Sequence, residues 1–146
     1  RLRRVTAARH LGERIAWRQG AEYGFQELAR WTELPDAVVA RALERVLFES
    51  GAFLRDGRAE LALDVEVRAF EEVRPAGRGN GPRSARVELA LLLTGVGDRA
   101  LLDRTLAAEA PLQGEGGEAL ADAIRCAIAE VTGATLTTVS ASTHGP

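Results

Sequence analysis

Two histidines and one cysteine are the side chains of this chain best suited to bind a metal ion or attack a substrate. His10 and His144 lie near opposite ends, and neither has a cysteine or carboxylate at a ligand spacing such as H-x-x-x-H or H-x-E. Cys126 has Asp122 and Glu130 at helical spacing, where their negative charges oppose the thiolate that a nucleophile needs. We therefore predict exposed histidines, a semi-buried core cysteine, and neither a metal site nor a cofactor.

Two glycine-rich segments share with phosphate-binding loops only their composition. The segment GRGNGPR at 77–83 has no G-K-[ST] sequence and does not lead from a strand into a helix, so we predict a hairpin loop. The segment GEGGE at 114–118 does precede a helical pattern. There, however, Glu115 and Glu118 would repel an anion and themselves interact favourably with the helix dipole. Neither segment is predicted to bind phosphate.

One pair of carboxylates, Asp64 and Glu66, lies on the polar side of an alternating segment. A general acid needs burial or a close charged partner to tune it, and nothing in the surrounding sequence indicates burial. We interpret the pair as part of a solvent-facing strand surface. Since no paired catalytic groups are found, the sequence predicts a protein that is not an enzyme.

Composition bounds the remaining classes of function. At 146 residues and 46% hydrophobic, the chain has the length of one domain with a single core. Its net charge is -2, with 19 basic and 21 acidic residues spread along the chain, which disfavours nucleic-acid binding. No apolar run reaches the ~18 residues of a membrane span, and the single cysteine cannot form an intramolecular disulfide.

Four of the seven aromatic residues fall between residues 16 and 35, namely Trp17, Tyr23, Phe25 and Trp31. The first three alternate in an expected hairpin and Trp31 precedes an expected helix, so packing on the sheet and over the first helical turn is one interpretation. The other is an apolar surface that meets a partner protein or a lipid, because amphipathic rings are favoured at interfaces. We take these four residues as the candidate partner-binding site.

Hydrophobic periodicity predicts the elements that position these residues. A hairpin with a glycine-containing turn is expected over 14–25, and a helix over 34–51 with Pro35 in its first turn and Gly51 at its C-terminal cap. Residues 59–73 and 84–95 alternate as two strands that pair as a hairpin. Residues 100–112 favour a further strand, with a helix as the alternative because of their alanines.

A second amphipathic helix is predicted over 116–133, and the small, polar remainder 134–146 is predicted to be frayed at its end. The element order is then a strand, a hairpin, a helix, three strands and a helix. Because each strand has one apolar face, both helices should cover the same side. This predicts an α+β fold: a two-layer sandwich, with a mainly antiparallel sheet and two helices packed on one face, in one domain over 1–146.

The runs RIAWR, YGF, RWTELP and SGAF, in that order, resemble the ABC-type transport auxiliary lipoprotein family. Its members carry a strand ending in an aromatic residue and arginine, a Tyr-rich segment, an Arg-Trp pair, a proline, and a helix ending in Ser-Gly-x-Phe. The matching positions here are Trp17, Arg18, Tyr23, Arg30, Trp31, Pro35, Ala42, Leu43, Leu47, Ser50, Gly51 and Phe53. The strand with Phe70 and the runs ARVELALLLTG and AEAPL keep the family order, so the resemblance spans roughly 12–131.

The resemblance implies a non-enzymatic accessory lipoprotein of a Gram-negative cell envelope. Its implied partners are an ABC transporter complex and a mammalian-cell-entry (MCE) domain protein, in systems implicated in lipid movement between the inner and outer membranes. An N-terminal lipid would anchor it in the periplasm, at the outer membrane. Cys126 lies in mid-helix and cannot be the lipidated residue. The signal, the lipobox and a first strand of the family pattern are therefore expected upstream of this chain.

Two other interpretations stay open at this point. One is a periplasmic module that holds a lipid or another hydrophobic molecule between helices and sheet, which requires a cavity. The other is an enzyme of envelope metabolism, which requires a perturbed carboxylate or histidine in a cleft.

Overall fold

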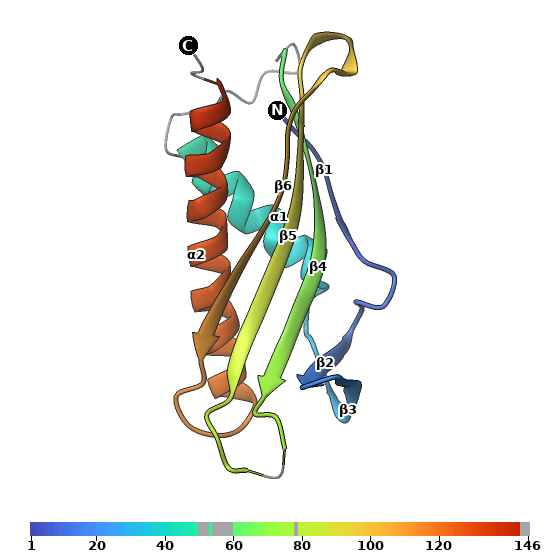
Figure 1. Cartoon of the computed structure of the whole chain (residues 1–146), viewed down its shortest axis with the longest axis vertical. Coiled ribbons are helices and arrows are strands. Elements are labelled where there is room, and N and C mark those ends of the chain that lie inside the picture. The colour runs from blue at the N-terminus through green and yellow to red at the C-terminus, as the bar shows by residue number, and fades with distance from the viewer. Residues whose placement is uncertain (50–52, 54–59, 78, 144–146) are drawn as a thin grey trace.

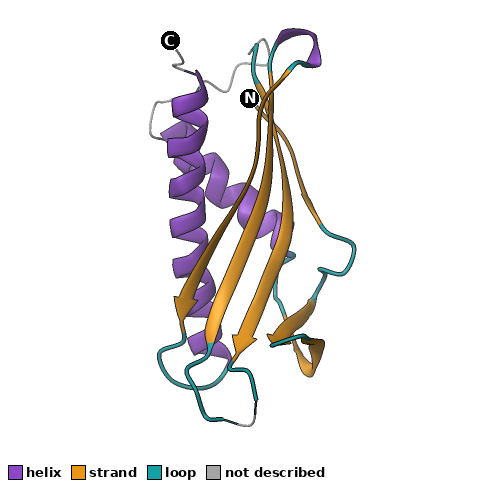
Figure 2. Cartoon of the chain, viewed as in Figure 1, coloured by secondary structure: helices purple, strands orange, loops and turns teal. Residues whose placement is uncertain are grey.

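A six-stranded sheet forms one layer of the protein, and two helices cover one of its faces (Figure 1). The computed structural model describes residues 1–49, 53, 60–77 and 79–143. Figure 2 shows the two layers by type of element. In chain order the elements are β1 (Leu2–Ala7), β2 (Arg14–Gln19), β3 (Glu22–Arg30), α1 (Pro35–Glu44), the π-helical turn η1 (Arg45–Glu49), β4 (Ala62–Arg74), β5 (Ser84–Thr94), the 3-10 turn η2 (Val96–Asp98), β6 (Ala100–Pro111) and α2 (Gly117–Thr143). The predicted two-layer α+β sandwich is confirmed.

Two parallel pairings join the N-terminal strands to the centre of the sheet. The strand order is β3-β2-β4-β5-β6, and β1 pairs with β4 outside this path. β1 runs parallel to the first part of β4, as far as the pair Ala7 and Val67. β2 runs parallel to the last part of β4, beginning at the pair Ala16 and Glu71. The pairs β2–β3, β4–β5 and β5–β6 are antiparallel, so the sheet is mainly antiparallel, as predicted. Alternation could not reveal the parallel pairs, because the side-chain period is two in both arrangements.

The core lies between the sheet and the helices and follows the predicted alternation. Alternate residues of β4 and β5 point into it and are at most 3% exposed: Leu63, Val65, Val67, Val87, Leu89, Leu91 and Leu93. The facing stripe of α2 contributes Leu120, Ile124, Ala127, Ile128 and Val131. Each large apolar side chain buried in this way stabilises the fold by about 1.5–3 kcal/mol. Helix α2 lies over β5 and β6 while α1 lies over β1 and β4, so both helices contribute to the burial of the central strands.

The structure decides between strand and helix for residues 100–111 and gives the bounds of the first helix. Residues 100–111 form strand β6 and not a helix, because they pair along almost all of β5, and the small side chains of Ala108 and Ala110 are buried beneath α2. Helix α1 begins at Pro35, whose missing N–H costs nothing in a first turn. It continues into the π-helical turn η1, which ends at Glu49. The predicted cap at Gly51 lies outside the described residues.

The predicted helix end at residue 133 is wrong, because α2 continues through Gly133 to Thr143. The residues after Thr143, where fraying is predicted, lie outside the described residues. The hydroxyls in this part donate to carbonyls of the preceding turn, as Thr135 does to Val131 at 2.8 Å and Ser142 to Thr138 at 2.9 Å. Polar side chains satisfied within the helix can be buried against the sheet together with Val139. No helix of the described ranges is long and apolar enough to cross a membrane.

Candidate partner-binding groove

A β-bulge in β4 buries two adjacent glutamates on opposite faces of the sheet. The pairing with β5 shifts by one residue between Val67 and Ala69. Such a shift reverses the alternation of side chains beyond it. Glu72 therefore points toward the helix layer and Glu71 toward the open face, and their exposed fractions are only 1% and 0%.

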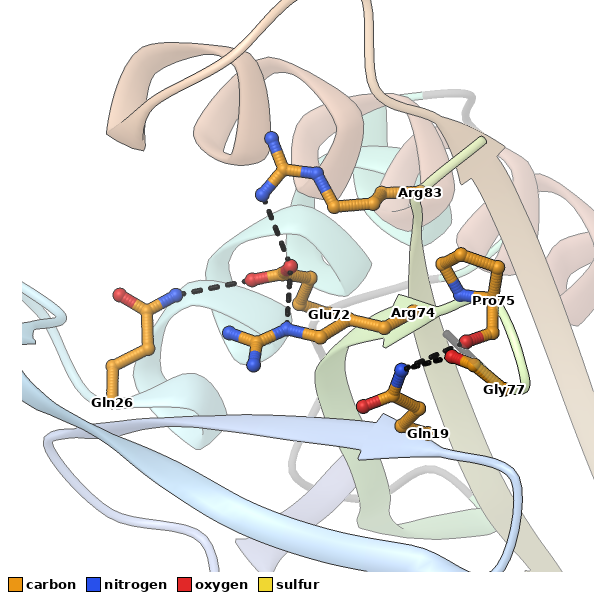
Figure 3. A network of polar contacts seen from close by, with 7 residues as sticks. All are labelled: Gln19, Gln26, Glu72, Arg74, Pro75, Gly77 and Arg83. Atoms are coloured by element: carbon orange, nitrogen blue, oxygen red, sulfur yellow. Dashed lines mark hydrogen bonds and ion pairs between the residues drawn. The ribbon is translucent and has the colours of Figure 1, made fainter. Parts of the chain in front are cut away.

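Glu72 is held by three donors from three parts of the chain (Figure 3). Its Oε1 accepts hydrogen bonds from Nε of Arg74 at 3.0 Å and Nη1 of Arg83 at 3.2 Å. Its Oε2 accepts one from Nε2 of Gln26 at 3.1 Å. A buried carboxylate is tolerated when it is paired and its oxygens accept hydrogen bonds. Glu72 thus ties the β4–β5 hairpin to the edge strand β3.

A groove of about 680 Å³ opens beside this network. Its lining combines apolar and charged side chains with the start of α2: Ile15, Trp17, Phe25, Gln26, Glu27, Leu28, Ala29, Glu72, Arg74, Arg83, Gly116, Gly117 and Leu120. Gln19 fastens the neighbouring loop, because its Nε2 donates to the carbonyls of Pro75 at 3.0 Å and Gly77 at 3.1 Å (Figure 3). We call this site the β3–β4 groove.

The indole of Trp17 has a defined place in the β3–β4 groove. It lies over its cross-strand neighbour Gly24, where an added Cβ would come within 2.5 Å of the ring. The guanidinium carbon of Arg74 lies 4.8 Å from the centre of the same ring, a cation–π geometry. Only a glycine opposite Trp17 leaves room for this position, so the sequence of β3 determines how the ring is presented.

The edge strand β3 presents Leu28 to solvent. The register between β2 and β3 jumps from the pair Ala16 and Phe25 to the pair Arg14 and Arg30, so the intervening residues of β3 bulge outward. Nη1 of Arg30 donates to the carbonyls of Glu27 and Ala29 within this bulge, both at 3.1 Å. Leu28 is 95% exposed and lines the β3–β4 groove. An arginine-braced bulge thus holds an apolar side chain in water.

The open face carries a second cluster around Glu71. Its Oε1 accepts a hydrogen bond from Nε of Arg18 at 2.9 Å. Oε2 of Glu71 and Oη of Tyr23 are both buried, and neither has a hydrogen-bond partner in the described part of the chain. Burial, and secondly the charge of Glu71, raises the pKa of Tyr23 above its ordinary value. An unpartnered buried polar atom costs about 1–3 kcal/mol, which the surrounding ring contacts must offset.

Those ring contacts come from β2, β3 and the loop before β2. The ring of Tyr23 makes edge contacts with His10 at 5.6 Å and Phe25 at 5.5 Å between centroids. Arg18 lies 5.1 Å from the centre of the Tyr23 ring, and Arg14 lies 4.4 Å from that of Phe25. Aromatic and cation–π contacts of this kind each contribute about 0.5–1.5 kcal/mol.

The four aromatic residues singled out from the sequence are therefore not one patch. Trp17 and Phe25 line the β3–β4 groove, whereas Tyr23 lies in the cluster around Glu71. Trp31 makes an edge contact with the buried Phe70 at 5.1 Å and packs against the core. The groove and the open-face cluster meet at Phe25, which belongs to both.

Sequence reasoning missed Glu71, Glu72, Arg74 and Arg83. The available signal was the doubled glutamate in FEEVR, which breaks strict alternation inside an otherwise regular strand. The prediction of a solvent-facing pair holds for Glu66, whose side chain is 46% exposed in its ion pair with Arg68. It is wrong for Asp64, whose side chain is only 13% exposed in its ion pair with Arg3.

The predictions for the histidines and the cysteine have mixed outcomes. Cys126 is exposed, so the prediction of a semi-buried core residue is wrong: the neighbouring residues Ala127 and Ile128 take the buried stripe. His10 is exposed, as predicted, while His144 lies outside the described residues. The loop at 77–83 connects β4 to β5 as a hairpin. Within the described ranges, no three His, Cys, Asp or Glu residues are grouped so that they could hold a metal ion.

Comparison with known protein families gives one match. The family model described as "ABC-type transport auxiliary lipoprotein component" matches residues 1–134. The match includes every strand and most of α2, hence also the β3–β4 groove and the Glu71 cluster. A search of curated protein sequences finds no match.

Solved structures share this fold. A protein of Xanthomonas campestris superposes with a TM-score of 0.83 at 23% identity, and the alignment covers 96% of this chain and 84% of that one. A Chlamydia trachomatis protein gives a TM-score of 0.60 at 10% identity, with 99% of each chain covered. A minor lipoprotein from Acinetobacter baumannii gives 0.53 at 13% identity, with 96% and 94% covered. At these identities the likeness establishes the fold alone.

Proposed function

The chain belongs to the family of ABC-type transport auxiliary lipoprotein components, and we propose that it is the periplasmic adaptor of an MCE-type system that moves lipids between the inner and outer membranes. The family serves transport and is not a family of enzymes. In this proposal the domain contributes binding and positioning only. It holds an MCE-domain protein of the ABC transporter complex in place, and an N-terminal lipid anchors it at the outer membrane.

The observation that supports docking at the β3–β4 groove is the 95% exposure of Leu28 beside Trp17 and Phe25. When a partner covers an exposed apolar side chain, apolar surface is removed from water, and this favours binding. Trp and Arg are the residue types most enriched at binding hot spots, and the groove presents Trp17 with Arg74 over its ring. Glu72 keeps Arg74 and Arg83 in fixed positions, which lowers the entropy lost on binding.

The test uses the full-length, lipidated protein and its MCE-domain partner from the same membranes. Leu28→Asp should weaken recovery of the MCE protein about tenfold, because it removes an apolar contact and would bury a carboxylate. The matched control is Val96→Asp, since Val96 is 76% exposed in η2 and lies outside the groove. Equal recovery by both variants would refute docking at this groove, and absence of any MCE protein from the wild-type sample would refute the adaptor role.

A periplasmic module that binds a hydrophobic ligand is the second candidate, and the volume of the β3–β4 groove favours it. At about 680 Å³ the groove falls within the size range of small-molecule sites. The cavity lined by Leu47, Phe53 and Val139 holds only about 20 Å³, roughly one water molecule. Native mass spectrometry of protein purified from membranes distinguishes the two candidates, because stoichiometric lipid that is lost in Leu28→Asp would support the ligand-binding role.

A further inference from the structure

A second groove lies between the two helices, away from the β3–β4 groove. Figure 1 shows α1 running obliquely across α2 on the helix side of the sheet. The groove between them has a volume of about 380 Å³. Its lining includes the apolar residues Ala42 of α1 and Ile128 and Ala129 of α2, which we call its floor. We call it the α1–α2 groove.

Three arginines form the rim of the α1–α2 groove, and none of the described residues that line it is acidic. Arg41 and Arg45 stand one turn apart on one side, and Arg125 stands on the other. Arg41 pairs with Glu33 and Arg125 with Asp122, and neither acid lines the groove. For Arg45 no ion pair is found within the described residues.

These arginines are free to change partners. The side chains of Arg41 and Arg125 remain 59% and 70% exposed in their ion pairs. Exposed ion pairs contribute at most about 1 kcal/mol, so a new carboxylate in the groove can replace the present ones at little cost. The groove as a whole therefore presents positive charge above an apolar floor.

The shape of the floor favours a helix as the occupant. Ala42 and Ala129 have small side chains, so a third helix can approach α1 and α2 closely. Packed helices usually lie about 8–10 Å apart between their axes. The spacing of Arg41 and Arg45 by four residues matches carboxylates at positions i and i+4 of a helix lying alongside.

We propose that the α1–α2 groove docks an amphipathic helix of a partner protein, whose apolar ridge lies on Ala42, Ile128 and Ala129 and whose carboxylates flank that ridge and pair with Arg41, Arg45 and Arg125. This is the helix-in-groove mode of recognition, with charge complementarity determining which helices bind. The site lies apart from Leu28, so this inference goes beyond the adaptor contact proposed above and does not depend on it.

The first experiment places a photo-crosslinking amino acid at Ala129, which is exposed, in the full-length protein in its own cells. The crosslinked peptide is identified by mass spectrometry and then synthesised. We expect a helical segment with carboxylates on both sides of an apolar ridge. A crosslink to a second copy of this chain, to a segment without this pattern, or to no protein at all would overturn the proposal.

The second experiment measures binding of the synthetic peptide to purified variants. Arg45→Glu and Arg125→Glu should each weaken binding about tenfold, because like charges replace a complementary pair. Arg99→Glu is the matched control, since Arg99 is also exposed but lies outside the groove and should leave the affinity unchanged. Thermal melts of all three variants exclude misfolding as the cause.

Two further results would also overturn the inference. One is peptide affinity that is the same in Arg45→Glu as in the wild type. The other is binding of the wild type, but not of Arg45→Glu, to vesicles of phosphatidylglycerol, which would assign the arginines to a membrane surface. Leu28→Asp should leave peptide binding intact, so failure of the adaptor proposal and failure of this one are distinguishable.

Discussion

Arg83 and Glu72 face each other across the β4–β5 hairpin, with Nη1 of the arginine donating to Oε1 of the glutamate at 3.2 Å. The carboxylate is almost fully buried, whereas the arginine side chain is 34% exposed. The contact therefore joins an interior charge to the rim of the β3–β4 groove. Stability and the shape of the proposed docking site depend on the same pair.

Replacing Glu72 with glutamine tests this dependence. The amide keeps the size of the side chain but loses the charge that faces Arg74 and Arg83, so the free energy of unfolding should fall by about 1–3 kcal/mol. Glu66→Gln is the control, because the pair of Glu66 with Arg68 is about half exposed on both sides and should change stability by less than about 0.5 kcal/mol. Urea unfolding measures both, and equal values would contradict the structural role of Glu72.

Gly24→Ala tests the position of the Trp17 ring. The added methyl group would lie 2.5 Å from the indole, so the ring must move and stability should fall by about 1–3 kcal/mol. Gly12→Ala is the control, since a Cβ at Gly12 meets no atom within 4 Å. In a Trp31→Phe background the fluorescence of Trp17 should shift in Gly24→Ala but not in Gly12→Ala. An unchanged emission spectrum would show that the ring is not confined by Gly24.

The pair of Asp64 with Arg3 predicts a pH dependence of stability. The hydrogen bond from the Arg3 guanidinium lowers the pKa of Asp64 below the ordinary value of 3.8. A lowered folded-state pKa means that the unfolded chain takes up the proton first, so the stabilisation is present above the ordinary pKa and is lost as pH falls through the folded-state value. The stability difference between wild type and Asp64→Asn should therefore shrink from about pH 6 to about pH 2. A difference independent of pH would contradict this pairing.

Val139→Ala tests the unexpected length of α2. Val139 is 1% exposed, so loss of two methyl groups should lower the free energy of unfolding by about 1–3 kcal/mol. Thr137→Ala, at an exposed position of the same helical segment, should change it by less than about 0.5 kcal/mol. If both variants had the wild-type stability, the segment after Gly133 would not be packed against the sheet.

Much of the layer architecture follows from the sequence alone. The alternation of Leu63, Val65 and Val67 marks a half-buried strand, and the stripe through Leu120, Ile124 and Val131 marks the helix that covers it. These patterns are local to each element. One apolar face per element is sufficient to predict two layers, because each such face must be buried against another element. The same logic ended the second helix too early, at Gly133, because the buried hydroxyl of Thr135 is satisfied within the helix by the carbonyl of Val131.

The sites were decided by tertiary structure. A bulge after Val67 reverses the faces of β4, so Glu71 and Glu72 become interior residues although their types predict exposure. The parallel pairing of β2 with β4 brings Arg18 to Glu71, and the turn of β5 brings Arg83 to Glu72. The sequence by itself determined which residues prefer the core, since that preference belongs to each side chain. Only the folded chain determined which charges meet, because those contacts depend on register and on segments far apart in the sequence.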